Sequence, residues 1–348
     1  MTQILTSRRI PSDTESAGFT RQAVERGWAD GLPCIPPTEA LVSQYIEAVG
    51  RPPDEVIAVL PPSRSPCTVE KIAINAAMTA AAPAAMPLLC AAIEALSEPD
   101  FALGGVNATT APVSPALIVN GPMRHALDIP FGPSCLGGAD SAAPAIGRAL
   151  RLIMRNVAGQ RPGQTTESVF GQPARVVSLV AAEWEEESPW LPLAARRGID
   201  GDAVTVFPMM GSMNVVDTIA DSAESIVQML GRSAGYLGAN GFLAATELSQ
   251  ILIAINPVWA EIVGRQYKDA EVLQELLWEE ACLPISVYPA SYRAGIEALE
   301  RVGADGRVHL LRSPHDVLVM VCGGMGSLHS TVLHGFTSSL AVTRPVVA

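Results

Sequence analysis

The fold is decided by residues 316–330, which read Asp-Val-Leu-Val-Met-Val-Cys-Gly-Gly-Met-Gly-Ser-Leu-His-Ser. An unbroken apolar run rich in β-branched residues is typical of a strand that is buried on both faces. The run ends in Gly-Gly-Met-Gly, a backbone that can turn sharply and let a ligand come close. In open α/β sheets, ligands bind at such strand ends. We therefore expect an α/β fold with a binding site near His329 and Ser330.

The composition predicts a large core divided between two lobes. The chain has 348 residues, of which 49% are hydrophobic, and its mean hydropathy is +0.28. A chain of this length can bury an extensive core. Runs typical of strands alternate with runs typical of helices, which favours an α/β class with mixed sheets and flanking helices. We expect a polar arm over residues 1–20 and two α/β lobes, 21–165 and 166–348, with a cleft between them.

The charge excludes a nucleic-acid-binding protein. The net charge is −12, and Lys71 and Lys268 are the only lysines, so no dense cationic face is expected. The apolar stretch 72–96 is interrupted by Pro83 and Pro87, which favours two short buried helices over a membrane span. The first residues are polar and lack a hydrophobic signal core. We expect a cytoplasmic protein that binds neither nucleic acid nor membrane and forms a homo-oligomer.

Local signals predict several helices. Thr38 is expected to cap a helix that continues to Val49 and ends at Gly50. Thr68 is expected to cap the next one. A short helix is expected over residues 23–30 and a longer one, with an apolar stripe, over residues 142–157.

Lys71 is the first candidate for chemistry. It lies at the start of an apolar helix, next to Glu70 and one turn before Asn75. A lysine in dry surroundings can act as a base or hold an anion, because burial lowers the pKa of its ammonium group. The structural alternative is that Lys71 reaches solvent and pairs with Glu70.

The turn after residue 321 supplies a second set of candidates. His329 can transfer a proton, and Ser330 can donate a hydrogen bond to a substrate. His329 and His334 have poor spacing for a metal pair, so no metal is expected. The glycines lack dinucleotide-binding spacing, so no cofactor is expected. Cys322 is either a nucleophile or a small core residue, and the roles of Cys322 and His334 stay open.

Polar residues at other strand ends are candidates for the same cleft. Glu183 follows an apolar run and begins an acidic segment, which is otherwise typical of a solvated loop. Asn120 and Asn214 end apolar runs and could present amides to a substrate, although asparagine is also common in turns. Thr109 and Thr110, after a pair of glycines, belong to the same class.

Several motifs carry a family resemblance. The chain resembles the large domain of the UGSC-type (seleno)protein family over nearly its whole length. The motifs are Gly27-Trp28-Ala29-Asp30-Gly31-Leu32-Pro33, Ile35-Pro36-Pro37-Thr38, Thr68-Val69-Glu70-Lys71-Ile72-Ala73-Ile74-Asn75, Ala108-Thr109-Thr110, Ile118-Val119-Asn120-Gly121-Pro122, Ile146-Gly147-Arg148-Ala149-Leu150-Arg151-Leu152, Glu187-Ser188-Pro189-Trp190 and Val342-Thr343-Arg344-Pro345.

The resemblance implies the fold and the location of the site more than a reaction. The family is named for a Cys- or Sec-Gly-Ser-Cys redox motif on a small domain, and this chain lacks that motif. Thiol or selenol chemistry would then need a separate redox partner protein. The chain also has Asn256-Pro257-Val258-Trp259-Ala260 where the family has Gly-Pro-Glu-His-Ala, which implies an altered substrate or chemistry.

These patterns lead to one functional hypothesis and two alternatives. The hypothesis is a lyase- or hydrolase-like enzyme that breaks or forms a C–X bond in a small polar or anionic metabolite by proton transfer. Lys71 and His329 would be base and acid, and Glu70 or Glu183 would orient them. The substrate would be held by Asn75, Thr109, Thr110, Asn120, Asn214, Ser330 and Arg344. The alternatives are the large subunit of a thiol- or selenol-dependent oxidoreductase and a non-catalytic binding protein.

Overall fold

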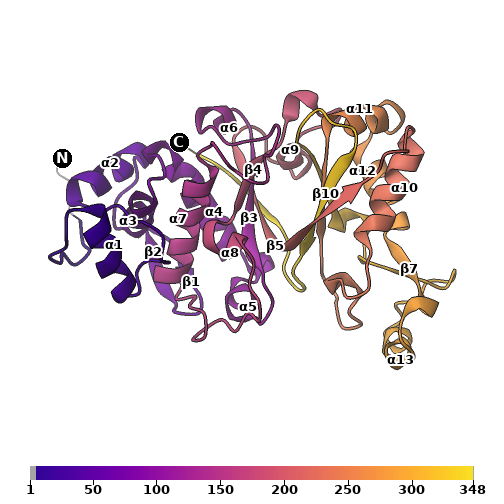
Figure 1. Cartoon of the computed structure of the whole chain (residues 1–348), viewed down its shortest axis with the longest axis horizontal. Helices are drawn as coiled ribbons and strands as arrows, with labels where there is room; N and C mark the ends of the chain where they lie inside the picture. The colour runs from indigo at the N-terminus through magenta and orange to yellow at the C-terminus, as the bar shows by residue number, and fades with distance from the viewer. Residues whose placement is uncertain (1–4, 348) are drawn as a thin grey trace.

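A seven-stranded mixed sheet runs through the centre of the chain, whose computed structural model describes residues 5–347 (Figure 1). The strand order is β4-β3-β5-β10-β6-β9, and β11 pairs with the first part of β5. The strands of this sheet are β3 (Ser114–Asn120), β4 (Leu179–Ala182), β5 (Ala203–Val216), β6 (Ile251–Ile255), β9 (Val317–Val321), β10 (His329–Gly335) and β11 (Val342–Pro345). The predicted α/β class, a mixed sheet with flanking helices, is confirmed.

Helices pack against the outer face of this sheet in both of its halves. Two small hairpins lie outside it: β1 (Val56–Leu60) with β2 (Ser65–Thr68), and β7 (Cys282–Pro284) with β8 (Arg307–His309). The helices are α1 (Ser16–Glu25), α2 (Glu39–Val49), α3 (Val69–Thr79), α4 (Met86–Ser97), α5 (Leu103–Ala108), α6 (Met123–Ala126), α7 (Ala143–Asn156), α8 (Ala174–Val177), α9 (Leu193–Arg196), α10 (Ala223–Ala234), α11 (Pro257–Gln266), α12 (Ala270–Glu280) and α13 (Ala290–Ala298).

The sheet consists of two halves with the same arrangement. In the first half, β3 pairs in parallel with β4 on one side and antiparallel with β5 on the other. In the second half, β6 pairs in parallel with β9 and antiparallel with β10. The halves meet where β5 and β10 pair antiparallel. In each half, the strand that is paired on both sides within the half comes first in the chain. The outer strand comes second, and the strand that joins the other half comes third.

The sheet is continuous across the boundary that was expected near residue 165. β3 precedes that boundary, yet it pairs with β4 and β5, which follow it. Residues 1–4 of the expected N-terminal arm lie outside the described residues. Thr6 and Ser7, from the remainder of the arm, bind the Glu70 carboxylate through their backbone N–H groups at 2.9 and 3.0 Å. This part of the arm is thus attached to α3.

The sheet curls until its two outer strands approach each other. The Trp184 N–H, just after β4, donates to the carbonyl oxygen of Val321 in β9 at 2.7 Å. Two further carbonyls on the same edge of β9 accept side-chain donors, Val319 from Arg196 and Val317 from Gln274. Edge strands expose backbone groups that need partners. Here the end of β4 and two side chains supply them.

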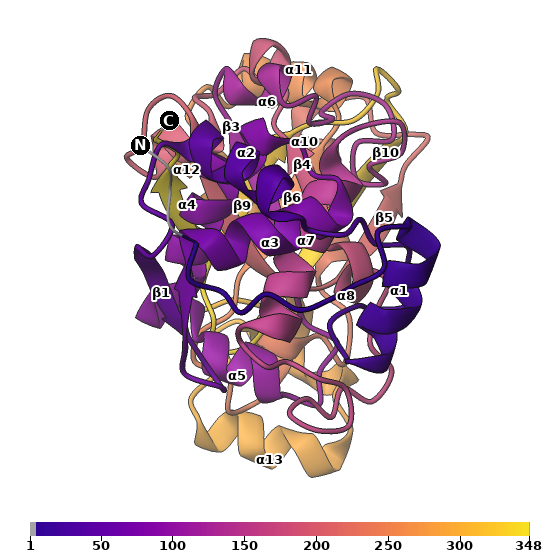
Figure 2. The same cartoon turned by 90° about the vertical axis from the view of Figure 1, so that its left-hand side faces the viewer.

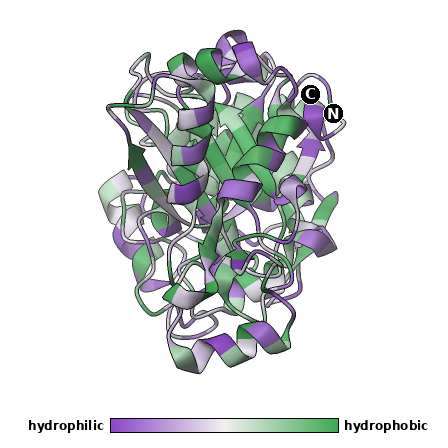
Figure 3. Ribbon diagram, turned by 90° about the vertical axis from the view of Figure 1, so that its right-hand side faces the viewer, coloured by the Kyte–Doolittle hydropathy of each residue, from purple (hydrophilic) through white to green (hydrophobic). Residues whose placement is uncertain are grey.

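The curl separates three parts of the core. Inward-facing strand residues form one cluster, which includes Ile118, Phe207, Leu252 and Met320. Outward-facing residues of the first half pack with α3, α4 and α7, and those of the second half pack with α10, α11 and α12. Figure 2 shows α2, α3 and α7 in front of the sheet, and Figure 3 shows hydrophobic residues concentrated on the central strands. This alternation follows from the two-residue period of a strand.

The predicted helix caps are present in the structure. Thr38 accepts a hydrogen bond from the Leu41 N–H at the start of α2, and Thr68 accepts one from the Lys71 N–H at the start of α3. The helix expected over residues 23–30 was wrong in its bounds, because α1 begins at Ser16 and ends at Glu25. The chain turns at Gly27, whose φ of 72° is easy only for glycine, and the turn stops the helix.

Candidate functional site

Two loops meet beyond the carboxyl ends of β6 and β9 and enclose a cavity of about 410 Å³. One loop, residues 133–137, lies between β3 and α7, and the other, residues 322–326, follows β9. The start of β10, residues 329–331, completes the wall together with Asn256. The predicted site at the end of the strand 317–321 therefore coincides with a cavity, at the place where α/β sheets bind ligands.

The floor of this cavity carries two interacting thiols, Cys135 and Cys322. A hydrogen bond from the Cys322 thiol lowers the pKa of Cys135, and this effect outweighs the burial that opposes ionisation. The backbone N–H groups of Gly323, Leu136 and Cys135 itself also favour the Cys135 thiolate. The hydrogen bond that the Gly323 N–H forms is to the Phe131 carbonyl oxygen, at 2.7 Å. Hydrogen bonds to a charged form stabilise that form.

The Cys322 thiol shows the opposite behaviour. Its hydrogen bond to Cys135, its burial and the nearby Glu183 carboxylate all raise its pKa. Cys322 therefore keeps its proton and donates it toward Cys135. When two thiols lie this close, one ionises and the other keeps its proton. The thiol with additional hydrogen-bond donors is expected to be the one that ionises.

Cys135 stands apart from all other cysteines of the chain. All six cysteines lie within the described residues, and none forms a disulfide. Burial raises the pKa of Cys34 and Cys282, and it raises the pKa of Cys67 and Cys90 to about 12. A lowered pKa marks the cysteines that act as nucleophiles or bases. Cys135 is therefore the strongest chemical candidate in the protein.

The predicted residues His329 and Ser330 line the same cavity. The His329 side chain is exposed at the rim. Ser330 is buried, and its hydroxyl donates to the Ala254 carbonyl oxygen at 2.6 Å, which leaves its oxygen able to accept a bond. Asn256 fixes the backbone here: its amide nitrogen donates to the His329 carbonyl oxygen at 2.8 Å, and its amide oxygen caps α11.

Asn120 and Glu183 occupy the equivalent strand ends in the first half of the sheet. Asn120 ends β3 as Asn256 follows β6, and Glu183 follows β4 as Cys322 follows β9. Glu183 is 1% exposed, and one of its carboxylate oxygens accepts bonds from the Asn120 amide at 2.7 Å and the Leu193 N–H at 2.6 Å. Burial raises the pKa of Glu183. Glu183 does not line the cavity, but its charge contributes to the raised pKa of Cys322, which does line it.

The variant Glu183→Gln is expected to become more stable than the wild type as the pH rises. Because the folded protein holds the Glu183 proton more tightly than the unfolded chain, wild-type stability falls as the pH rises from the ordinary glutamate pKa of 4.5 toward the raised value. Glutamine keeps an oxygen acceptor for Asn120 and Leu193 and does not ionise. We expect a gain of about 1–3 kcal/mol at neutral pH, measured by urea unfolding from pH 4 upward.

The pH trend decides this prediction. A Glu183→Gln variant that is less stable than the wild type by the same amount at every pH would contradict it. That result would mean that the carboxylate contributes only through its hydrogen bonds.

The structure does not bring Lys71 and Glu70 to this cavity. Both lie on α3, which packs in the helical layer of the first half. The Lys71 ammonium donates to the Pro66 carbonyl oxygen at 2.6 Å. Burial disfavours a charged Glu70, but hydrogen bonds from Thr6 and Ser7 outweigh it and hold the pKa of Glu70 below its usual value. Lys71 and His329, which were expected to act together as base and acid, therefore do not share a cavity among the described residues.

The remaining predicted residues serve connections within the fold. Asn75 joins α3 to α7, because its amide oxygen accepts a bond from Asn156 at 2.8 Å. The carbonyl oxygens of Thr109 and Thr110 accept bonds from Thr166 and Val169 in the following loop, as the hydrogen bonds at 3.2 and 2.9 Å show.

Asn214 and Arg344 do not line the cavity, although Asn214 pairs with the cavity residue Thr331 across β5 and β10. Asn214 is exposed on β5, and Arg344 pairs with Glu98. His334, whose role the sequence left open, is buried with its Nε2 2.9 Å from the Ala234 carbonyl oxygen. Burial lowers the pKa of His334, which keeps the ring neutral.

Comparison with known proteins found no family model and no curated protein that matches the chain. The resemblance to the UGSC-type family therefore stays a prediction. Within the described residues, no three histidine, cysteine or acidic side chains gather as a metal ion would require. None of the helices in that range has the length and apolar character to cross a bilayer.

The sequence carried one signal for Cys135 that went unused. Cys135 precedes Leu136-Gly137-Gly138, and Cys322 directly precedes Gly323-Gly324. Two thiols that each adjoin a pair of glycines stand on loops whose backbone N–H groups can approach the sulfur closely. The absence of a Cys-x-x-Cys pair concealed them, since their pairing depends on strands that lie far apart in the sequence.

Proposed function

We propose that the chain is an enzyme of small-molecule chemistry that breaks or forms a C–X bond in the cavity between residues 133–137 and 322–326. One observation supports this most strongly: among the six cysteines, Cys135 alone has a lowered pKa. Perturbed pKa values in a cavity are typical of catalytic groups. A cavity of about 410 Å³ suits a small metabolite.

Each cavity residue has a defined role in this proposal. The Cys135 thiolate attacks the substrate or removes a proton from it. The Cys322 thiol and the Leu136 N–H hold the negative charge on Cys135 until the reaction begins. His329, exposed at the rim, supplies a proton to the leaving group as the general acid. The Ser330 hydroxyl oxygen accepts a hydrogen bond from the substrate.

A second candidate function is a thiol-dependent oxidoreductase, which the contact between the two thiols favours. Cys135 would attack a disulfide substrate and release one thiol. Cys322, after losing its proton, would then attack the mixed disulfide and release the second thiol. In total, two thiols of the protein become one disulfide, and the substrate takes up two electrons and two protons.

The functional test compares the wild type with Cys135→Ala and Lys71→Met on the same small-metabolite extract. Mass spectrometry measures which compounds disappear and which appear. We expect the wild type and Lys71→Met to convert the same compound and Cys135→Ala to convert it at least about a hundredfold more slowly. Conversion that requires Lys71 but not Cys135 would restore the proton-transfer hypothesis based on Lys71.

The mass of the protein distinguishes the two chemical classes. In the oxidoreductase case, reaction with a disulfide oxidises the two thiols and leaves the wild type lighter by two hydrogens, and Cys322→Ala retains the mixed disulfide. A ligand that binds without any product would support the non-catalytic alternative. The cytoplasmic location, the homo-oligomer and the redox partner protein stay predictions.

A further inference from the structure

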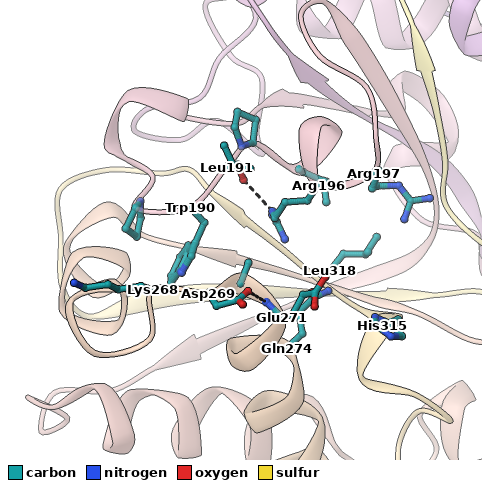
Figure 4. A pocket seen from close by; sticks show the side chains of 14 residues that line it. Trp190, Leu191, Arg196, Arg197, Lys268, Asp269, Glu271, Gln274, His315 and Leu318 are labelled. Carbon is teal, nitrogen blue, oxygen red and sulfur yellow. Dashed lines mark hydrogen bonds between the residues drawn. The ribbon is translucent and has the colours of Figure 1, made fainter.

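A second and larger cavity, of about 970 Å³, lies against the outer edge of β9. It is bounded by residues 189–193, by α9 with the adjoining Arg197, by the start of α12 and by His315 (Figure 4). It shares no lining residue with the Cys135 cavity. None of the residues assigned to the Cys135 chemistry lines it.

Two arginines dominate the chemistry of this cavity. Arg196 donates its Nε to the Leu191 carbonyl oxygen at 2.9 Å and its Nη2 to Val319. Arg197 donates its Nε to the Thr343 hydroxyl at 2.7 Å and its Nη2 to the Ala341 carbonyl oxygen at 2.8 Å. Each guanidinium is therefore held rigidly by two bonds, and its Nη1 takes no part in them.

Neither arginine forms a salt bridge within the described residues, although the nearby Glu183 charge partly offsets the effect of burial on the pKa of Arg196. The salt bridges of residues 5–347 involve other arginines and His125. Both side chains are partly buried, and burial lowers the pKa of Arg196 and of Arg197. The Arg197 guanidinium is desolvated and lies near the like charge of Arg196, with no acidic partner among the described residues, so an anion that reaches it gains strongly. Pre-positioned arginines are suited to carboxylates and phosphates.

The other walls define the rest of the ligand. Trp190, Pro192 and Leu318 contribute apolar surface to the cavity. Acidic side chains are present as well, but the Asp269 carboxylate is bonded to the Glu271 N–H at 2.9 Å, where it caps α12. In Figure 4, Lys268 points away from the other labelled side chains. The two arginines thus provide the positive charge of the cavity, and the wall around Trp190 provides an apolar contact for the rest of the ligand.

We propose that this cavity binds a small organic anion, a carboxylate or a phosphate attached to an apolar group, through Arg196 and Arg197. The anionic end lies against the two guanidinium groups, and the apolar end lies along Trp190 and Leu318. The site shares no lining residue with the Cys135 cavity, so either proposal can fail without the other.

Calorimetric titration of the full chain tests the proposal with four probes: phenyl phosphate, benzoate, inorganic phosphate and the uncharged benzyl alcohol. We expect the wild type to bind at least one of the two aromatic anions more tightly than benzyl alcohol. The preferred anion then shows whether the site takes phosphates or carboxylates. We expect Arg197→Gln to weaken that binding about tenfold or more, the loss typical of a charge-assisted hydrogen bond.

Two further variants test the effect of charge on anion binding. The first is expected to strengthen binding, and the second is its control. Glu271→Gln removes a negative charge from the cavity wall and is expected to strengthen anion binding about two- to fivefold. Glu275→Gln makes the same change one turn further along α12, outside the cavity, and is expected to leave the affinity unchanged. Because Arg197 also bonds to Thr343 and Ala341, Glu271→Gln decides the outcome if Arg197→Gln does not fold.

Two results would overturn the proposal. One is wild-type protein that binds benzyl alcohol as tightly as both aromatic anions, which would make the cavity merely apolar. The other is an equal affinity gain in Glu271→Gln and Glu275→Gln, which would reflect only the net charge of the protein.

Discussion

Iodoacetamide in limiting amount at pH 7 is expected to alkylate Cys135 before any other cysteine of the chain. The thiolate is the reactive form of cysteine, and only Cys135 has a pKa below the ordinary value of 9.0. Because the pKa is lowered, the alkylation rate should rise with pH through a midpoint below 9.0 and then level off. Peptide mapping by mass spectrometry at a series of pH values measures both the order of labelling and the midpoint.

Cys282 is the matched control for this experiment. Its side chain is more exposed than that of Cys135, but burial raises the pKa of its thiol. If accessibility rather than ionisation decides the order, Cys282 reacts first. In Cys322→Ala the hydrogen bond to Cys135 is lost, so we expect labelling at pH 7 to slow about tenfold and to recover at high pH. Unchanged labelling in Cys322→Ala would contradict the proposed role of Cys322.

The second large effect is expected at Arg148, far from the cavity. Arg148 lies on α7 and holds the loop after α1 through two bonds of 2.8 Å to the Asp30 carboxylate. It also donates to the Leu32 and Pro33 carbonyl oxygens at 3.0 and 2.7 Å. Arg148→Met keeps an unbranched stem but removes the guanidinium group, which leaves a half-buried carboxylate unpaired. We expect a loss of about 3–5 kcal/mol in the free energy of unfolding, measured in urea.

Arg265→Met provides the comparison for Arg148. Arg265 pairs with Glu261 one turn earlier on α11, and both side chains are exposed. Exposed pairs of this kind contribute about 0.3–0.5 kcal/mol. Equal losses in the two variants would show that Arg148 contributes no more than a surface ion pair. A loss confined to Arg148→Met would show that the ion pair between Arg148 and Asp30 stabilises the fold far more than a surface pair does.

Much of the local structure could be predicted from the sequence. The strand at Val317–Val321 and the strand ending at Asn120 are buried on both faces, so their apolar runs are unbroken. Helix α7 repeats its apolar residues at helical spacing, and Thr38 and Thr68 are good caps. Each of these signals depends only on residues a few positions apart.

The repeated halves and the curl of the sheet could not be predicted in the same way. They depend on pairings between segments that are far apart in the chain, such as β5 with β10. The two halves share little sequence beyond Ile118-Val119-Asn120 and Ala254-Ile255-Asn256, so no fixed-period repeat is visible.

The candidate site was predictable only in part, for a related reason. His329 and Ser330 follow a buried strand directly, and the structure places both at the cavity. The position of Lys71 on a helix predicts which neighbours share its face, but not which cavity that face meets. Cys135 was missed because its partner comes from a loop in the other half.

The repeated halves carry a consequence for how chemistry could evolve in this fold. Two identical copies of such a half, joined as a symmetric dimer, would place the same side chain after both outer strands, either two glutamates or two cysteines. Fusion into one chain frees the two positions to diverge, so Glu183 can follow β4 while Cys322 follows β9. A buried carboxyl with a raised pKa can then lie near a thiol in the other half of the sheet, an asymmetry that a dyad would forbid.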